Sequence, residues 1–194
     1  MTEREKWEHG MWYDANYDPE ICAEREKAEA LYFEFNQTPP SQKEKRAELL
    51  KKLLPNMEKD VVILPHFYTD YGYNCLIGEG TYINHGAYLM DCAKITIGKH
   101  CFIGPNCGMY TAIHPLLPEE RNKGLENTKP ITLGDNVWLG GDVTILPGVT
   151  IGAGTTIGAG SVVTRDIPAG VVAAGNPCKV LRAITEKDGI EFQK

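Results

Sequence analysis

The stretch from Leu133 to Val163 reads LGDNVW LGGDVT ILPGVT IGAGTT IGAGSV V, with one aliphatic residue opening each group of six. The six positions in this register are all aliphatic: Leu133, Leu139, Ile145, Ile151, Ile157 and Val163. A strand with one buried face repeats every two residues and an α-helix every 3.6, so neither explains a step of six. A period of six predicts a triangular coil, in which each side is a short strand and each corner is a tight turn. We therefore expect an all-β solenoid whose large aliphatic side chains stack along its axis at strand spacing.

The same register returns upstream, at Ile77, Ile83 and Leu89 and then at Ile97, Ile103 and Met109. Residues 110–130 interrupt it as a long excursion before it resumes at Leu133. Gly follows the aliphatic residue at seven positions: Gly78, Gly98, Gly104, Gly134, Gly140, Gly152 and Gly158. We expect these glycines to supply the permissive backbone that tight corners need.

The first 60 residues differ in character, because they carry 24 of the 46 charged residues and read as helical. Helix starts are predicted by capping-box spacing at Thr2/Glu5 and Ser41/Glu44, and by Asp18 ahead of Pro19. The apolar stripes that follow are typical of packing faces. We predict a helical region over residues 1–58, a β-helix over 59–168 and a C-terminal strand and tail over 169–194.

Composition excludes several classes of protein. A net charge of −6 argues against a nucleic-acid partner. The longest aliphatic run, Val61 to Leu64, is too short to span a membrane, and the N-terminus has no apolar signal segment. The six cysteines contain no C-x-x-C pair, so we expect reduced, buried thiols and no metal site in a cytoplasmic protein.

Five histidines are candidates for acid–base chemistry. His9 and His66 lie at a predicted helix end and in a linker, and His85 and His100 fall in predicted coil turns. His114 lies in the excursion at 110–130, and long loops on a rigid scaffold are where functional residues concentrate. The residues alone leave His114 as either a general base or a surface histidine.

Several motifs resemble the hexapeptide-repeat acyltransferases, in their maltose/galactoside O-acetyltransferase branch. They are HGMWYD at 9–14, LYFEFN at 31–36, FYTDYG at 67–72, YIN at 82–84, HP at 114–115, ITLGDNVWLG at 131–140 and VAAGNPCKV at 172–180. The resemblance covers nearly the whole chain and implies a left-handed parallel β-helix with a helical N-terminal region and a short C-terminal tail. It also implies a homotrimer that moves an acetyl group from acetyl-coenzyme A to a sugar hydroxyl, such as that of maltose, glucose or a galactoside, without a catalytic metal.

The resemblance also assigns roles to residues. His114 would take the proton of the attacking hydroxyl, and Asn84 would orient the acceptor or the thioester. Acceptor contacts would come from Asp70 and Asp91, from Asp14 by a looser match, and from Cys92, where relatives can carry a carboxylate. Coenzyme contacts would come from Gly104, Trp138, Gly141, Ala159, Thr164, Arg165, Lys179 and Arg182. The structural alternatives are a corner residue that fills a glycine position for Asn84 and a surface packing residue for Trp138. For Lys179 and Arg182 the alternative is a solvated charge in a tail.

Three alternatives have specific requirements. A metal-dependent hydratase resembling the gamma-class carbonic anhydrases needs three converging histidines, for which His85, His100 and His114 are the candidates. A non-catalytic scaffold would need neither the histidine of the excursion nor the basic tail. An acetyltransferase of the same fold that acts on serine or a nucleotide-linked sugar is the nearest competitor, although the N-terminal segment fits the sugar branch better.

Overall fold

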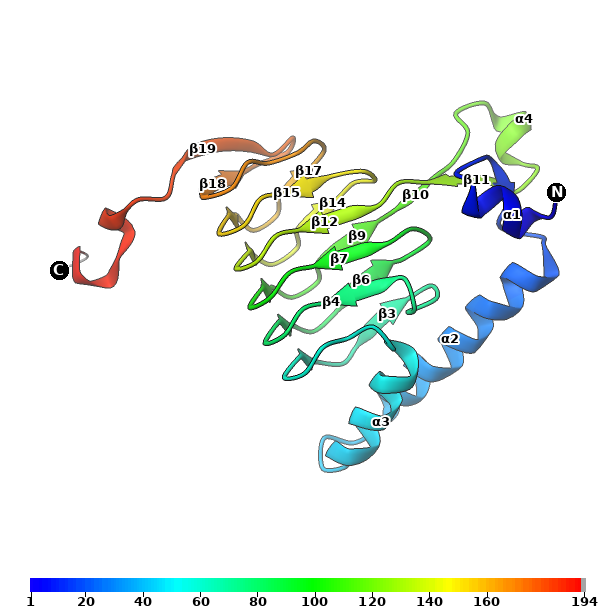
Figure 1. Cartoon of the computed structure of the whole chain (residues 1–194), viewed down its shortest axis with the longest axis horizontal. Coiled ribbons are helices and arrows are strands. Elements are labelled where there is room, and N and C mark those ends of the chain that lie inside the picture. Colours follow the sequence, from blue (N-terminus) through cyan, green and yellow to red (C-terminus); the bar gives the residue numbers. More distant parts are fainter. Residues whose placement is uncertain (193–194) are drawn as a thin grey trace.

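The computed structural model describes residues 1–192, and its strands are short, two to five residues each. The chain winds from one flat sheet to the next and stacks its coils as a triangular prism (Figure 1). Each coil visits a seven-stranded, a five-stranded and a four-stranded sheet in that order. The predicted left-handed parallel β-helix with an N-terminal helical region is confirmed.

The three sheets are the sides of the prism. The seven-stranded sheet contains β2 (Val62–Ile63), β5 (Tyr82–Ile83), β8 (Phe102–Ile103), β13 (Trp138–Leu139), β16 (Thr156–Ile157), β18 (Val171–Ala174) and β19 (Lys179–Ala183). The five-stranded sheet contains β3 (Phe67–Thr69), β6 (Ala87–Met90), β9 (Gly108–Tyr110), β14 (Thr144–Ile145) and β17 (Val162–Val163). The four-stranded sheet contains β4 (Cys75–Ile77), β7 (Ile95–Ile97), β12 (Ile131–Leu133) and β15 (Thr150–Ile151). Within these three sheets neighbouring coils pair in parallel, and at the C-terminal end β19 folds back antiparallel onto β18.

The hexapeptide register sets which side chains form the core. Ile103 lies opposite Ile83 on one side and opposite Leu139 on the other, and Leu139 lies opposite Ile157. Each of these four side chains is at most 1% exposed, so the aliphatic position of the repeat points inward as predicted. The stacked column gives every coil the same apolar interior, and burial of this column stabilises the fold.

The repeat glycines are required for a different reason from the one predicted. Gly134 and Gly140 do not adopt a positive φ; instead, a Cβ on either would lie 2.6 Å from the backbone nitrogen of the next coil, at Ala153 and Ala159. The left-handed conformation occurs two residues later in the corner, at Asn136 and at Gly154 and Gly160. Gly after the aliphatic residue therefore allows close approach between coils, and the corner conformation is a separate demand.

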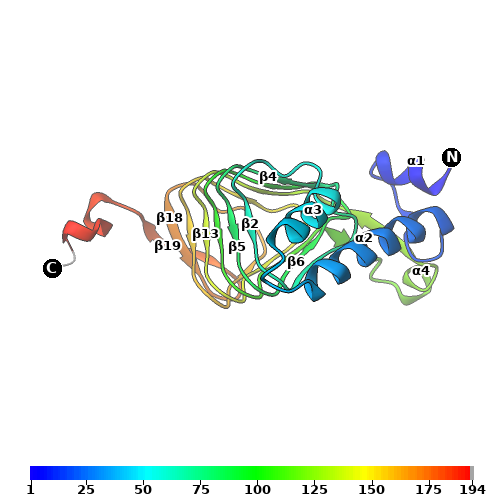
Figure 2. The same ribbon diagram turned by 90° about the horizontal axis from the view of Figure 1, so that it is seen from below.

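Three helices form the N-terminal region. α1 (Glu3–Glu8) starts at the predicted Thr2/Glu5 capping box, and α2 (Pro19–Gln37) starts at Asp18, whose carboxylate accepts from the next turn. The predicted cap at Ser41 is wrong, because α3 (Lys43–Leu53) begins after Gln42 and has no side-chain cap. Helices α2 and α3 lie over the first coils and close that end of the apolar interior (Figure 2).

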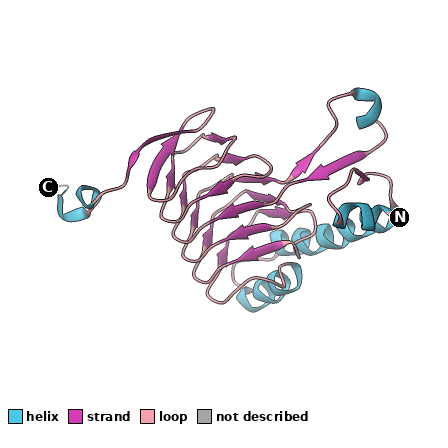
Figure 3. Cartoon of the chain, turned by 45° about the horizontal axis from the view of Figure 1, so that its top comes forward, coloured by secondary structure: helices cyan, strands magenta, loops and turns pink. Residues whose placement is uncertain are grey.

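The excursion forms a hairpin that projects from the prism. It consists of β10 (Ala112–Ile113), the single turn α4 (Pro118–Arg121) and β11 (Leu125–Thr128), and β11 also pairs with β1 (Tyr13–Asp14) (Figure 3). A second apolar cluster, which includes Trp7, Tyr13 and Tyr71, joins this hairpin region to the N-terminal segment. The Trp7 indole N–H donates to the carbonyl of Cys92 at 2.7 Å.

The C-terminal segment leaves the prism after β19 and forms the turns Glu186–Asp188 and Ile190–Phe192. Residues 193 and 194, which belong to the predicted tail, lie outside the described residues. Among residues 1–192, no helix combines the length and apolar character needed to cross a membrane.

Candidate functional site

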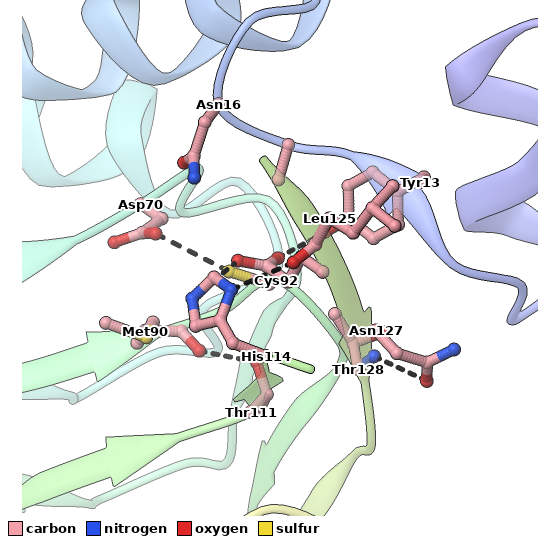
Figure 4. Close-up of polar contacts among 12 residues, drawn as sticks. Tyr13, Asn16, Asp70, Met90, Cys92, Thr111, His114, Leu125, Asn127 and Thr128 are labelled. Atoms are coloured by element: carbon pink, nitrogen blue, oxygen red, sulfur yellow. Dashed lines mark hydrogen bonds and ion pairs between the residues drawn. The ribbon is translucent and has the colours of Figure 1, made fainter. Parts of the chain in front are cut away.

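His114 lies at the base of the projecting hairpin, directly after β10. Its Nδ1 lies 3.0 Å from the carbonyl oxygen of Leu125 on the facing strand. Because a carbonyl only accepts, this bond places a proton on Nδ1, and in the neutral ring Nε2 then has the lone pair. The side chain is 43% exposed and lines a hollow, and Figure 4 shows its ring close to Leu125 on the facing strand. This is the arrangement that a general base requires.

Glu126 lies beside this imidazole and was not found from the sequence. Its Oε2 is 3.8 Å from Nε2 of His114, while its Oε1 accepts a short hydrogen bond from the hydroxyl of Tyr13. Its carboxylate is nearly buried because β11 is the middle strand between β1 and β10. Burial raises the pKa of Glu126, although the bond from Tyr13 and the charge of His114 act in the opposite direction.

Asp70 lies close by, at the end of β3. Its Oδ1 accepts from the Tyr88 hydroxyl at 2.5 Å and its Oδ2 from the Cys92 thiol at 3.5 Å. Asp70 also lines a hollow of about 200 Å³ with Arg25, Tyr32 and Tyr88. The expected acceptor residues Asp70 and Cys92 therefore lie together, with a cation and two phenols around them. Burial raises the pKa of the Cys92 thiol well above its usual range.

The other two expected acceptor residues have internal partners. Asp91 is fully buried, and its carboxylate accepts from the Thr69 hydroxyl and from backbone N–H groups of residues 70, 71 and 74. Asp91 thereby holds the turn that carries Asp70. The Oδ1 of Asp14 accepts from the backbone N–H groups of Asn16 and Tyr17, within its own turn.

A larger hollow of about 540 Å³ lies on the open side of His114. It is lined by apolar side chains of the excursion and by Trp12, and two of them are highly exposed: Leu116 at 93% and Leu117 at 61%. Among residues 1–192, no group of His, Cys, Asp or Glu is placed to hold a metal ion, and His85, His100 and His114 do not form one.

Asn84 follows β5, at the corner between the seven-stranded and five-stranded sheets. Its Oδ1 accepts from the backbone N–H of His85 at 2.8 Å. The hairpin that carries His114 instead leaves the prism after β9, at the corner between the five-stranded and four-stranded sheets. The two predicted catalytic residues thus lie at different edges of the same prism.

The expected coenzyme contacts follow the seven-stranded sheet and its corners. Trp138 is 55% exposed on β13, and in the corner beside it Gly104, Gly140 and Ala159 stack on successive coils. Gly141 lies in that corner too, where a Cβ would touch Pro105. This corner therefore has a backbone surface free of large side chains.

The other expected coenzyme contacts lie in the C-terminal coils. Thr164 and Arg165 are exposed after β17, and Arg165 and Lys179 share a hollow of about 250 Å³. Arg182 forms an ion pair with Asp188 at 2.7 Å. Arg165 and Lys179 thus lie around one hollow, which Asp166 also lines, whereas Arg182 is paired with Asp188.

The family models match this arrangement along the chain. A maltose acetyltransferase hexapeptide capping motif matches residues 6–57, a bacterial transferase hexapeptide model of six repeats matches 130–165, and a hexapeptide repeat of succinyl-transferase matches 94–114. The helical cap and the coils together are therefore those of a hexapeptide-repeat transferase.

Curated relatives are similar over nearly their whole length. A putative acetyltransferase of Saccharomyces cerevisiae is 50% identical over 92% of this chain and 91% of its own length. One of Staphylococcus aureus strain MRSA252 is 53% identical over 95% of this chain and 92% of its own.

Two solved structures superpose with a TM-score of 0.92. A maltose O-acetyltransferase from Clostridium difficile 630 is 44% identical and covers 96% of this chain and 99% of its own. A galactoside acetyltransferase in complex with coenzyme A is 38% identical, and the match covers 97% of this chain and 94% of that chain. The chain belongs to the hexapeptide-repeat acyltransferases, in the maltose/galactoside O-acetyltransferase branch, and is an acetyltransferase.

Proposed function

We propose that this protein transfers the acetyl group of acetyl-coenzyme A to a hydroxyl group of a sugar, with His114 as the general base. The observation that carries this proposal is the bond from Nδ1 of His114 to the carbonyl of Leu125, which leaves the lone pair of Nε2 on an accessible edge. Neutral imidazole is the usual base for this task near neutral pH.

The reaction needs one proton carrier. The acceptor hydroxyl gives its proton to Nε2 as its oxygen attacks the carbonyl carbon of the thioester. The new C–O bond forms, the C–S bond breaks, and the departing thiolate takes the proton from Nε2–H. His114 thus ends each cycle in its starting tautomer.

The acceptor side of the site is polar, which suits a polyhydroxy compound. The hollow beside Asp70 presents a carboxylate, the guanidinium of Arg25 and the phenols of Tyr32 and Tyr88. Sugar hydroxyls donate and accept hydrogen bonds, and these groups offer both partners. The sugar acceptors named for the solved relatives agree with this lining.

The coenzyme side fits a long, thin ligand with phosphates. The bare corner at Gly104 and Gly141 lets a chain approach the backbone, and Arg165 with Lys179 supplies positive charge. The galactoside acetyltransferase structure contains coenzyme A, and that of a Vibrio cholerae acetyltransferase, 36% identical, contains acetyl-coenzyme A.

We infer that the working unit is a homotrimer. Val62, Tyr82, Phe102 and Trp138 lie in register on the outer face of the seven-stranded sheet, and three of them are 44–57% exposed. An apolar ladder of this kind favours association, which is usually symmetric. Association also resolves the separation of Asn84 from His114, because the corner of one protomer can meet the hairpin of another.

A panel of acceptors tests the function. Purified protein is mixed with acetyl-coenzyme A and with maltose, glucose, a galactoside, serine or a nucleotide-linked sugar, and release of free thiol is followed. We expect thiol release with at least one of the first three, and acetylated sugar by mass spectrometry. Turnover with serine or the nucleotide-linked sugar alone would reassign the acceptor, and no turnover with any of them would remove the proposal.

A further inference from the structure

Oε2 of Glu126 lies 3.8 Å from Nε2 of His114, the ring nitrogen that does not bind Leu125. The groups that face the pair come from several elements: Tyr13 from β1, Asp70 from the end of β3, and Tyr71 and Cys92 from the turns that follow β3 and β6. Of these, the Tyr13 hydroxyl donates to Glu126 and the Cys92 thiol also contacts it, whereas Asp70 is engaged by Tyr88 and Cys92. The carboxylate of Glu126 is thus anchored on one oxygen and faces Nε2 with the other.

We propose that Glu126 is a positioning residue for the base, and that its carboxylate stabilises the imidazolium form of His114 during acetyl transfer. The inference rests on the proposed role of His114 as the base. It gives His114 a partner, Glu126, which lies on β11, the returning strand of the same excursion.

The distance between the two side chains and the tautomer of His114 support this role of Glu126. At 3.8 Å, Oε2 is too far from Nε2 for a hydrogen bond, so in the resting state Nε2 keeps its lone pair for the acceptor hydroxyl. Once Nε2 has taken the proton, the ring is a cation beside an anion in surroundings drier than water, where opposite charges attract more strongly. Glu126 therefore favours the state in which the proton has been transferred.

Tyr13 determines which oxygen faces the ring. Its hydroxyl donates to Oε1, and its own ring stacks on Trp7 with centroids 5.3 Å apart. Since Tyr13 is fully buried, the carboxylate cannot rotate away without losing that donor. The chain Tyr13–Glu126–His114 joins the N-terminal segment to the hairpin, so the helical region takes part in holding the base.

The test compares Glu126→Gln with Glu119→Gln, a substitution of an exposed glutamate in α4 of the same excursion. We expect Glu126→Gln to lower kcat at least about tenfold, with the KM of the acceptor nearly unchanged. The acid limb of the kcat/KM profile should move to lower pH, because the imidazolium has lost its anionic neighbour. Glu119→Gln should change neither quantity.

Two further variants separate the possible outcomes. In a His114→Ala background, Glu126→Gln should have no further effect on kcat, because it acts through the imidazole. Tyr13→Phe keeps the stacked ring and removes only the donor; it should move the acid limb in the same direction by less, and it carries the test if Glu126→Gln does not fold.

An unmoved acid limb in a folded Glu126→Gln enzyme overturns the inference, and so does a raised KM at unchanged kcat, which would make Glu126 an acceptor contact. Loss of activity in His114→Ala with an unmoved limb in Glu126→Gln leaves the proposed function standing and removes only the role of Glu126. Retained activity in His114→Ala removes both.

Discussion

The backbone N–H of Asp70 donates a hydrogen bond to Oδ1 of Asp91 at 3.1 Å, so a fully buried carboxylate holds the turn that carries a half-buried one. The same Oδ1 accepts from Thr69 and Tyr71, and Oδ2 accepts from the backbone of Asn74. Burial raises the pKa of Asp91 while these bonds lower it. We infer that Asp91 serves the site by fixing Asp70.

Asp91→Asn should therefore destabilise the protein and weaken activity together. The amide can replace only one of the two oxygens, so at least one backbone donor is left buried without a partner, which costs about 1–3 kcal/mol. Thermal unfolding measures this as a lower Tm. Asp142→Asn is the matched control, because Asp142 is an exposed corner residue with a positive φ that Asn also tolerates. Equal Tm values for the two variants would contradict the structural role of Asp91.

Ile151→Asp should unfold the β-helix, whereas Thr150→Asp, one residue earlier, should be mild. Ile151 is fully buried opposite Leu133, and an unpaired carboxylate there costs several kcal/mol. Thr150 is exposed on the outer face of β15, where we expect a change of at most about 1 kcal/mol. Circular dichroism and thermal unfolding of both variants test the inward assignment, and similar behaviour would refute it.

The sequence predicted the solenoid because its core is periodic. One inward aliphatic residue every six positions is a local signal, and the caps at Thr2 and Asp18 are local as well. Ser41 shows the limit of such signals, because capping-box spacing is present but α3 begins two residues later without a side-chain cap.

Glu126 was not predictable in the same way. Its environment arises from antiparallel pairing with Tyr13, a residue 113 positions away, in the part of the chain where the repeat is interrupted. No spacing in the sequence announces that pairing. The corner glycines were located correctly, but their role in coil-to-coil approach depends on distances between neighbouring coils that only the structure contains.

The six cysteines should be free thiols that react slowly in the native state. All six are unpaired, and all but Cys22 are buried. Burial raises the pKa of Cys107 to about 11 and that of Cys75 well above its usual range, so little thiolate is present near neutral pH. A chromogenic thiol reagent should label Cys22 first and the others only after denaturation. Rapid native labelling of Cys101 or Cys107 would contradict the inward register.

The protein should have a solution mass of about three times 21.5 kDa. The exposed ladder that includes Phe102 and Trp138 gives each protomer an apolar face to cover, and we expect a trimer to bring the Asn84 corner of one protomer to the His114 hairpin of the next. Light scattering at micromolar concentration measures this mass. A value near 21.5 kDa would leave Asn84 and His114 apart and remove the joint site.

His114→Ala should abolish most acetyl transfer while leaving the fold, the assembly and the affinity for the coenzyme nearly intact. The two functions are separate in the chain, because the basic pair Arg165 and Lys179 lies on the C-terminal coils, whereas in the proposed mechanism His114 takes only the proton of the acceptor. A general base contributes about 10²–10⁴-fold, so the loss should appear in kcat with little change in the Kd of the coenzyme. Asn84→Ala should be less severe, since the role we propose for Asn84 is to orient a ligand and not to transfer a proton. His100→Asn is the control, because His100 is an exposed corner residue with a positive φ, and it should keep full activity.

If His114→Ala retains more than roughly a tenth of the wild-type kcat across the acceptor panel, a loss well below the range for a general base, another group takes the proton. His85, which directly follows Asn84, would then be the next residue to replace.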